Sequence, residues 1–334
     1  RSRLRPPPQD VGEVLLEVEA LTSLDADVIG VMELENDGYG PGSAIAALVD
    51  ALNAEEGAGT WAFVDVDAAT GVLNAAGDDA IKVALLYRPG AVTPVPGTTR
   101  VEPSDLFERA PVAQTFQTDD GGRFTVVVNH FKSKGSCPAS GADTDQGDGQ
   151  SCWNVHRTAQ AQALASWISS TVVPGAGDPD VLIIGDLNSY AKEDPILALQ
   201  AAGYTNLVEA YGGPEAYSYA FDGQWGYLDH ALASSSLVSQ VTGAADVHIN
   251  ADEPSVLDYL TDFKSAGQID SLYEPDRFRT SDHDPVVIGL DPVGTVQELG
   301  VHFITPQNGW TWLAGLPLPV IFQVTGPDGR PLSR

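Results

Sequence analysis

Short apolar segments that end in a polar side chain recur along the chain, and this pattern constrains the fold more than any other feature. The segments and the residues that close them are 28–32 with Glu33, 125–129 with His130, and 181–185 with Asp186. Each has the length of a β-strand and is apolar at nearly every position, as in strands buried on both faces. Strands of this kind, alternating with helices, predict a layered α/β domain in which a sheet packs on a second sheet or on helices.

The segments between these strands predict the helices and the remaining strands. Apolar residues recur at helical spacing over 11–21 and 153–172, Ser43 is suited to cap a helix through Leu52, and Asp194-Pro195 places a proline in a first helical turn. Further strands are expected over the segments 61–67, 81–87, 228–233 and 285–290.

The texture of the sequence changes after Leu290. Proline and glycine become frequent there, and only 320–325 reads as a strand followed by a turn. We therefore expect a main domain over residues 1–291, followed by a linker and a partial β-module over 292–334.

The chain is strongly acidic, with 17 Lys+Arg against 46 Asp+Glu and a net charge of −29. A protein that binds nucleic acid by general neutralisation of phosphates should be basic, so any phosphate chemistry here must rely on cations recruited to a local site. Export or a salty habitat explains the charge without any function. No apolar run approaches the ~18 residues of a membrane span, and the sequence indicates no protein partner.

Two cysteines, Cys137 and Cys152, flank a stretch rich in Gly, Asp and Ser. A disulfide between them predicts an oxidising compartment, and hence a secreted protein, whereas two free buried thiols are the alternative. Within the stretch, Asp143, Asp145 and Asp148 could hold a structural Ca²⁺. A solvated turn is the competing interpretation, because the twelve-residue loop pattern with its closing Glu is absent.

The polar residues at strand ends are the types that one metal-dependent reaction needs. They are Glu33, His130, Asp186, Asn188, Asp229, Asp282 and His283. Carboxylate and amide oxygens are hard ligands suited to Mg²⁺ or Mn²⁺, and histidines move protons near neutral pH. Any one of them could be a turn-former or a satisfied core residue. Their recurrence at the ends of five separate segments indicates a shared site.

These segments resemble the endonuclease/exonuclease/phosphatase (DNase I-like) superfamily, and within it the bacterial extracellular nucleases of the ExeM/NucH type. The resemblance is carried by Val31-Met-Glu-Leu-Glu-Asn-Asp37, Asn129-His-Phe-Lys-Ser-Lys-Gly135, Gly185-Asp-Leu-Asn-Ser-Tyr190, Leu228-Asp-His-Ala-Leu232 and Ser281-Asp-His-Asp-Pro-Val286. It covers roughly residues 11–291 in the expected order. It implies a four-layer α/β sandwich, two packed mixed β-sheets flanked by helices, that hydrolyses phosphoesters with Mg²⁺ or a similar ion.

The resemblance also implies a role for each residue. Glu33 would hold the metal with Asp282 as a further ligand, and Asp186 and Asn188 would bind metal or phosphate and position the attacking water. Asp229 would orient His283, which would take a proton from that water. His130 would hydrogen-bond the scissile phosphate and protonate the leaving oxygen.

The chain departs from the superfamily pattern in two places. Members usually begin with a strand that carries an Asn of the site, and no such strand precedes the helix at Val11. Members also place a Glu behind the first histidine, where this chain has Ile81, with Asp79 the nearest substitute.

Basic residues lie on or beside these segments and predict a local rim that grips phosphate within an acidic surface. The candidates are Arg88, Lys132, Lys134 and Arg157, with Lys192, Arg277 and Arg279 nearby. Pairing with the abundant carboxylates is the alternative.

We therefore expect a secreted nuclease that cleaves DNA, with RNA as a further substrate, and leaves 5′-phosphate ends. A related phosphodiesterase or phosphatase acting on lipid or inositol phosphates is one alternative. A noncatalytic surface module that kept the fold is another.

Overall fold

The protein is described here from a computed structural model, in which residues 9–257, 264–272, 274, 276–292, 300–305 and 321–325 are placed. The chain divides into two compact units, Arg1–Pro292 and Val293–Arg334. The first unit carries the α/β architecture. From the second, the structure describes one antiparallel pair, β15 (Gly300–Thr305) with β16 (Ile321–Thr325).

A seven-stranded sheet lies at the centre of the first unit. Its order is β4-β6-β7-β8-β12-β9, with β5 also paired to β6. The strands are β4 (Val92–Pro94), β5 (Arg100–Val101), β6 (Arg109–Thr118), β7 (Arg123–His130), β8 (Val181–Asp186), β9 (Thr205–Asn206) and β12 (Asp229–Ala233). Only the β7–β8 pair, linked through a helical crossover, is parallel among these pairings.

Smaller sheets accompany the central one. β1 (Val28–Glu35), β3 (Ile81–Tyr87) and β2 (Ala62–Phe63) form a three-stranded sheet in the order β1-β3-β2. β13 (Val241–Asp246) pairs with β14 (Val286–Leu290), and β10 (Tyr219–Phe221) forms a hairpin with β11 (Gln224–Gly226).

Apolar residues on both faces of the central sheet explain the layers. On one face, Val126 and Val128 of β7 pack with Val83 and Leu85 of β3 in a core between two sheets. The neighbouring Val127 points to the other face, where a second core meets helices. Burial on both sides accounts for the uninterrupted apolar runs.

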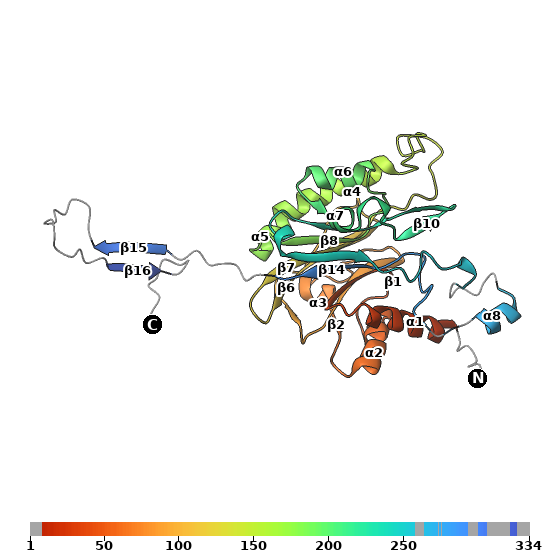
Figure 1. Ribbon diagram of the computed structural model, residues 1–334, viewed down its shortest axis with the longest axis horizontal. Coiled ribbons are helices and arrows are strands. Elements are labelled where there is room, and N and C mark those ends of the chain that lie inside the picture. The colour runs from red at the N-terminus through yellow and green to blue at the C-terminus, as the bar shows by residue number, and fades with distance from the viewer. Residues whose placement is uncertain are drawn as a thin grey trace. The chain divides into compact units, whose positions relative to one another are not determined.

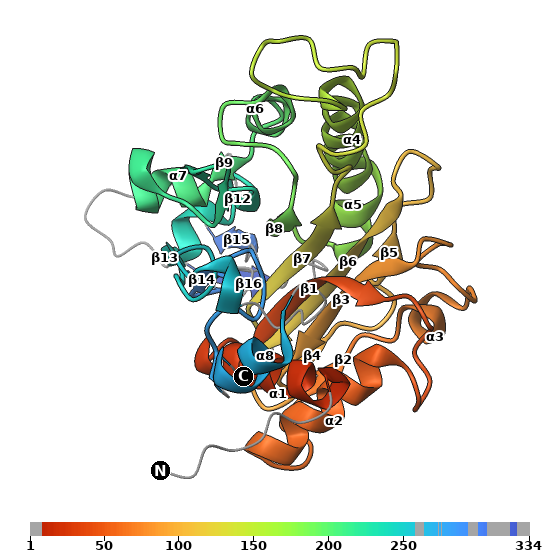
Figure 2. The ribbon, with the colours of Figure 1, turned by 90° about the vertical axis from the view of Figure 1, so that its right-hand side faces the viewer.

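Helices cover the outer faces of the sheets. They are α1 (Gln9–Ser23), α2 (Ala44–Glu56), α3 (Val66–Thr70), α4 (Asn154–Trp167), α5 (Val173–Ala176), α6 (Asp194–Ala201) and α7 (Leu207–Gly212). A further short helix, α8 (Ala266–Leu272), has no buried residue and covers no sheet. Figure 1 shows α4 and α6 on one side of the strands and α1 and α2 on the other, and Figure 2 gives the view turned by 90°. The result is the four-layer α/β sandwich expected from the sequence, and that prediction of fold class is confirmed.

The two sheets approach closely at Gly30 of β1. A Cβ atom built there would lie 2.6 Å from Cδ1 of Ile184 on β8. The absence of a side chain therefore lets β1 cross β8 near the strand ends that carry Glu33 and Asp186.

The sequence located most elements but misassigned one and missed others. The segment 61–67 was expected to be one strand, yet the strand ends at Phe63 and α3 begins at Val66, because the Asp65 side chain caps that helix by accepting from the Ala68 N–H. The long strand β6 carried no prediction. Among the described residues, no helix is both long and apolar enough to cross a membrane.

Candidate active site

The register of three adjacent strands brings three of the predicted residues side by side. His130 at the end of β7 pairs with Asp186 at the end of β8, and Asp186 pairs with Asp229 at the start of β12. β7 and β8 are parallel, and β12 is antiparallel to β8, so the end of β8 meets the start of β12 at one edge of the sheet. The site is therefore set by strand pairing.

Glycine is required immediately before Asp186. Gly185 has φ of +126°, and a Cβ there would lie 2.0 Å from the backbone oxygen of Asn129. Only glycine adopts this conformation at little cost. The chain can therefore turn at the end of β8 and present Asp186 beside His130.

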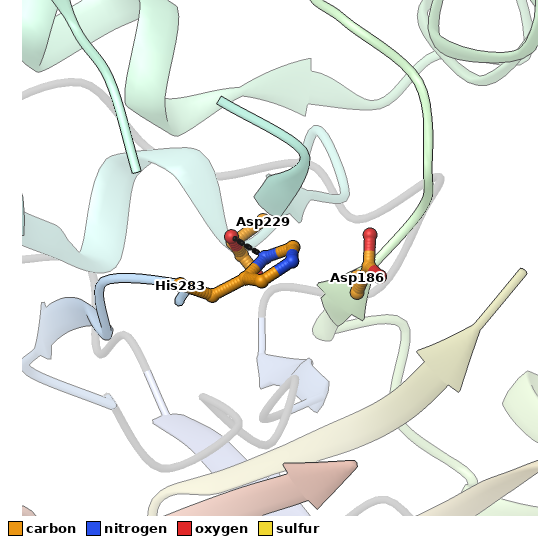
Figure 3. A group of neighbouring side chains, drawn as sticks. All are labelled: Asp186, Asp229 and His283. Carbon is orange, nitrogen blue, oxygen red and sulfur yellow. Dashed lines mark hydrogen bonds and ion pairs between the residues drawn. The ribbon is translucent and has the colours of Figure 1, made fainter. Parts of the chain in front are cut away.

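His283 meets Asp229 across the site, although 54 residues separate them. Its Nδ1 lies 2.8 Å from Asp229 Oδ2, and the Ser218 hydroxyl donates to the same oxygen at 2.6 Å. Burial alone lowers the pKa of His283, but the Asp229 carboxylate and its hydrogen bond outweigh this and raise the pKa to about 10. Figure 3 shows the imidazole lying between the carboxylates of Asp229 and Asp186.

Asp186 and Asn188 form a buried pair. The Asn188 backbone N–H donates to Asp186 Oδ1 at 2.7 Å, and its side-chain amide donates to Asp186 Oδ2 and to the Phe131 carbonyl. Both amide hydrogens are thus used within the protein, so Asn188 would offer its oxygen to a ligand. Burial and the neighbouring Asp229 charge raise the pKa of Asp186 to about 7.

His130 faces Asp186 and Glu33 and is almost fully buried. Its Nε2 lies 3.5 Å from Asp186 Oδ2 and 3.8 Å from Glu33 Oε1. Burial, with the nearby charges of Arg109 and His283, lowers the pKa of His130 to about 3, so this imidazole is neutral. Its Nδ1 has no hydrogen-bond partner among the described residues. Asp79 does not fill the position of the missing Glu, because its carboxylate accepts from the Ile81 N–H.

A strained backbone and a bulge direct Glu33 toward the site. The β1–β3 register shifts between Val31 and Leu34, and Glu33 has φ of +59°, which is uncommon for a residue with a side chain. The Glu33 side chain is 73% exposed. The bulge therefore leaves this carboxylate open to solvent beside His130.

The donor atoms fit a divalent cation of the hard type. Ligand atoms of Asp186, Asp229 and His283 all lie within 4.8 Å of one another. Two buried carboxylates so close together are costly unless a positive charge lies beside them. Glu33 and the exposed Asp282 lie outside this group of three, although the charge of Asp282 acts on His283.

The basic residues that were predicted to bind phosphate do not all come together beside the site. Arg88 donates its backbone N–H to Asp27, at the opposite end of β1 from Glu33, and its guanidinium pairs with Glu56. Lys132 lies 4.0 Å from Glu108 and over the Trp153 ring. Each of these cations already has an acidic partner, as the alternative interpretation held.

Arg157 and Lys134 serve the packing of loops around the site. Arg157 is completely buried and donates to the Ser189 hydroxyl and to backbone carbonyls of Lys132, Gln150 and Cys152. The Lys134 ammonium donates to Glu193 at 2.5 Å and 2.6 Å. Arg157 was expected to bind substrate phosphate, and this is corrected because its donors are occupied inside the protein.

The cysteine loop is closed by the predicted disulfide between Cys137 and Cys152. Asp143 accepts from the His156 N–H, and Asp145 and Asp148 accept from N–H groups two residues further along the chain. The bonds of Asp145 and Asp148 are those of local turns, whereas Asp143 reaches 13 residues along the chain to the first turn of α4. No metal-binding group is found among these three aspartates in the described chain, so the turn interpretation is the better supported one.

Sequence reasoning missed three buried residues that shape the site. Ser218 donates its hydroxyl to Asp229. Arg109 lies opposite His130 in the β6–β7 register and donates to the Phe131 carbonyl. His230 Nε2 lies 2.7 Å from the Ser189 carbonyl. Only their placement next to site residues in three dimensions reveals them. His230 directly follows Asp229, which is the one signal the sequence offered.

The chain belongs to the endonuclease/exonuclease/phosphatase family, whose model matches residues 4–283. No match was found among curated protein sequences. Members of this family hydrolyse phosphoesters and typically use divalent metal ions.

Solved structures share the fold at low identity. A mannosyl-6-phosphatase from Bacteroides thetaiotaomicron is 16% identical, with a TM-score of 0.52 over 86% of this chain and 97% of that one. D. rerio TDP2 complexed with a single-strand DNA product is 13% identical, with a TM-score of 0.50 over 83% and 90%. The human Nocturnin catalytic domain with bound sulfate is 16% identical, with a TM-score of 0.50 over 84% and 87%.

Proposed function

We propose that this protein is a secreted nuclease of the bacterial extracellular type, which hydrolyses phosphodiester bonds of DNA with Mg²⁺ and leaves 5′-phosphate ends. The observation that carries the proposal is the arrangement of Ser218, Asp229 and His283 facing Asp186. A carboxylate behind an imidazole fixes its tautomer and raises its basicity, which suits a residue that deprotonates water.

Within the group of three donors, Asp229 and His283 are bonded to each other, which leaves Asp186 to hold the cation. We propose Glu33 as a second ligand from outside that group, with Asn188 and Asp282 able to contribute oxygen atoms. Mg²⁺ prefers carboxylate, amide and water oxygens of this kind, and Mn²⁺ accepts the same set. When bound, such an ion stabilises negative charge on the phosphoryl oxygens. It would also supply the positive charge that the chain as a whole lacks.

The side chains of the chain itself divide the remaining work. His283, oriented by Asp229, would accept the proton of the attacking water at its Nε2. This requires the neutral imidazole, so a bound cation would have to lower its pKa from about 10 for the step to proceed near neutral pH. Asn188 would orient that water or a phosphate oxygen through its amide oxygen. His130 is neutral, so it would act by donating a hydrogen bond to the phosphate, and we no longer assign it the protonation of the leaving oxygen.

Secretion is supported by the disulfide between Cys137 and Cys152 and by the acidic composition. Disulfides persist in oxidising compartments, and abundant carboxylates favour solubility. Action outside the cytoplasm accords with a substrate such as free DNA.

Nicking of supercoiled plasmid DNA in Mg²⁺ tests the proposal. We expect nicking by the native chain, its loss in EDTA, and a fall of about 10²- to 10⁴-fold for His283→Ala, as for loss of a general base. His156→Ala is the matched control, since this half-buried histidine lies on α4 beside Glu108.

Hydrolysis of other phosphoesters, measured side by side with DNA under the same conditions, separates the alternatives. Sphingomyelin and an inositol polyphosphate should be hydrolysed far more slowly than DNA. Preference for either would move the protein to the lipid or inositol phosphate class. Inactivity toward all three would favour a noncatalytic module.

A further inference from the structure

The β10–β11 hairpin carries an aromatic surface directly beside His283. The Tyr219 ring centre lies 4.5 Å from that of His283, and the two residues also form an isolated β-bridge. The Phe221 ring stacks on Tyr219 at 6.5 Å with an interplanar angle of 10°. Phe221 is nevertheless 65% exposed. The large apolar ring of Phe221 is therefore exposed to solvent, and Tyr219 links it to the candidate base, His283.

The hairpin is fixed to the site by hydrogen bonds. Ser218, immediately before β10, is fully buried, bonds to Asp229 and accepts the Asp284 backbone N–H at 2.7 Å. Tyr190, which follows the Asp186–Asn188 segment, packs on Gly226, where a Cβ would lie 2.8 Å from its ring. The aromatic surface therefore keeps a set position relative to the strand ends that carry the site.

The two faces of the hairpin differ. Tyr219 and Phe221 share a face because they are two residues apart, whereas Trp225 pairs with Ala220 and lies on the other face. Trp225 is 54% exposed and contacts Tyr217. The face of Tyr219 and Phe221, with Tyr190 beside it, is the one that continues into the site.

The charges nearby point to the kind of ligand that this face accepts. Asp222 at the hairpin turn and Asp282 beside His283 are acidic, and the buried Arg157 and paired Lys134 offer little to a phosphate backbone. The charge of Arg279 also acts on Tyr219, but that guanidinium donates to the Asn250 carbonyl. A nucleic acid held here would gain affinity from contact with aromatic rings, which needs no positive charge. The acidic groups repel an anionic lipid surface and the phosphates of a nucleic acid alike, so the affinity must come from the contact with the rings. Bases in a duplex are stacked on one another, so the face fits an unpaired base.

We propose that Phe221 and Tyr219 form a stacking platform for an unpaired nucleobase next to the scissile phosphate, and thus that the enzyme prefers single-stranded DNA or frayed ends. This inference rests on the proposed nuclease function. It makes Phe221 a residue that determines substrate preference without taking part in the chemical step.

The test compares two hexanucleotides with the same sugar-phosphate backbone, one of thymidines and one of abasic residues. Stacking on one aromatic side chain predicts that native protein has a KM about tenfold lower for the thymidine hexamer. Phe221→Ala should raise KM for the thymidine hexamer by a similar factor, leave kcat unchanged and abolish the preference. Phe221→Tyr should restore it.

Trp225→Ala is the matched control, because it removes an exposed ring from the other face of the same hairpin. It should keep the native preference for the thymidine hexamer. An equal effect of Trp225→Ala and Phe221→Ala, or native KM values in Phe221→Ala, would overturn the proposal.

Binding in EDTA separates this inference from the nuclease function. Fluorescence anisotropy of a labelled thymidine hexamer reports the stacking contact without hydrolysis. The native chain could show no hydrolysis and still bind the thymidine hexamer more tightly than Phe221→Ala does. That result would support the stacking platform and contradict the catalytic proposal. Equal binding of thymidine and abasic hexamers by the native chain contradicts the platform.

Discussion

At the scale of single residues, charge and burial determine what each side chain of the site can do. The two histidines illustrate this, since burial lowers the pKa of both. His283 has Asp229 behind it, and its pKa rises to about 10, whereas His130 has Arg109 nearby and its pKa falls to about 3. Without a bound cation, His283 is therefore protonated at neutral pH, and a cation beside it would lower its pKa toward the range in which it can act as a base. His130 is instead a neutral hydrogen-bond donor.

Replacing Asp229 by Asn should weaken that base. Without the carboxylate, the pKa of His283 falls, so the neutral form persists to lower pH. We expect the acid limb of the kcat profile to move to lower pH and the plateau to fall, because a weaker base removes the proton less readily. A steady-state pH series at saturating Mg²⁺ measures both, and an acid limb that stays in place or moves to higher pH would contradict the assigned pair.

Arg157 should matter for stability because it is a buried cation. Removing it in Arg157→Ala takes a buried positive charge away from Glu193, 3.9 Å distant, and removes a donor from the carbonyls of Gln150 and Cys152, which costs about 3–5 kcal/mol in the free energy of unfolding. The control is Lys192→Ala, an exposed cation paired with Glu209, which should cost less than about 1 kcal/mol. Urea unfolding of both variants gives the comparison, and equal losses would contradict the buried role.

At the scale of elements, the strand ends carry the site, and the sequence made this visible only in part. The apolar runs before His130 and Asp186 predicted strands, and both lie at one edge because β7 and β8 are parallel and in register. Arg109 could not be found this way, since β6 mixes polar and apolar positions. Arg157 was misjudged because its neighbours in sequence do not reveal that its side chain points inward.

At the end of β8, Gly185 is the strand position at which we expect a substitution to disturb the site most. An alanine there requires φ of +126° and brings its Cβ to 2.0 Å from the Asn129 oxygen, so β7 and β8 must shift apart. We expect Gly185→Ala to lower kcat by about 10²-fold, as for a displacement of roughly 1 Å in catalytic geometry.

Gly177→Ala is the control for the conformational effect alone. Gly177 has φ of +66° at the end of α5, and a Cβ there meets nothing within 4 Å. This variant should cost about 1 kcal/mol in stability and leave kcat intact. Native kcat in Gly185→Ala would show that the turn does not position Asp186.

At the scale of the whole molecule, the four layers bring distant segments together around a cluster of carboxylates. Residues of β7, β8 and β12 meet through pairing, and His283 arrives from the segment before β14. The fold class followed from the sequence because burial on both faces of a strand leaves a readable apolar run. The contact between the Tyr219 and His283 rings could not be predicted in this way, because it depends on how the hairpin packs against the site.

The central claim is that this cluster captures a divalent cation that makes a phosphodiester open to attack. Calorimetric titration with Mg²⁺ tests it on the native chain, on Asp186→Asn and on Asp145→Asn, whose aspartate lies in the exposed cysteine loop. We expect binding and plasmid nicking to be lost together in Asp186→Asn and kept in Asp145→Asn. Because the pKa of Asp186 is about 7, native affinity should fall as pH drops below 7. Native Mg²⁺ affinity and nicking in Asp186→Asn would contradict the account.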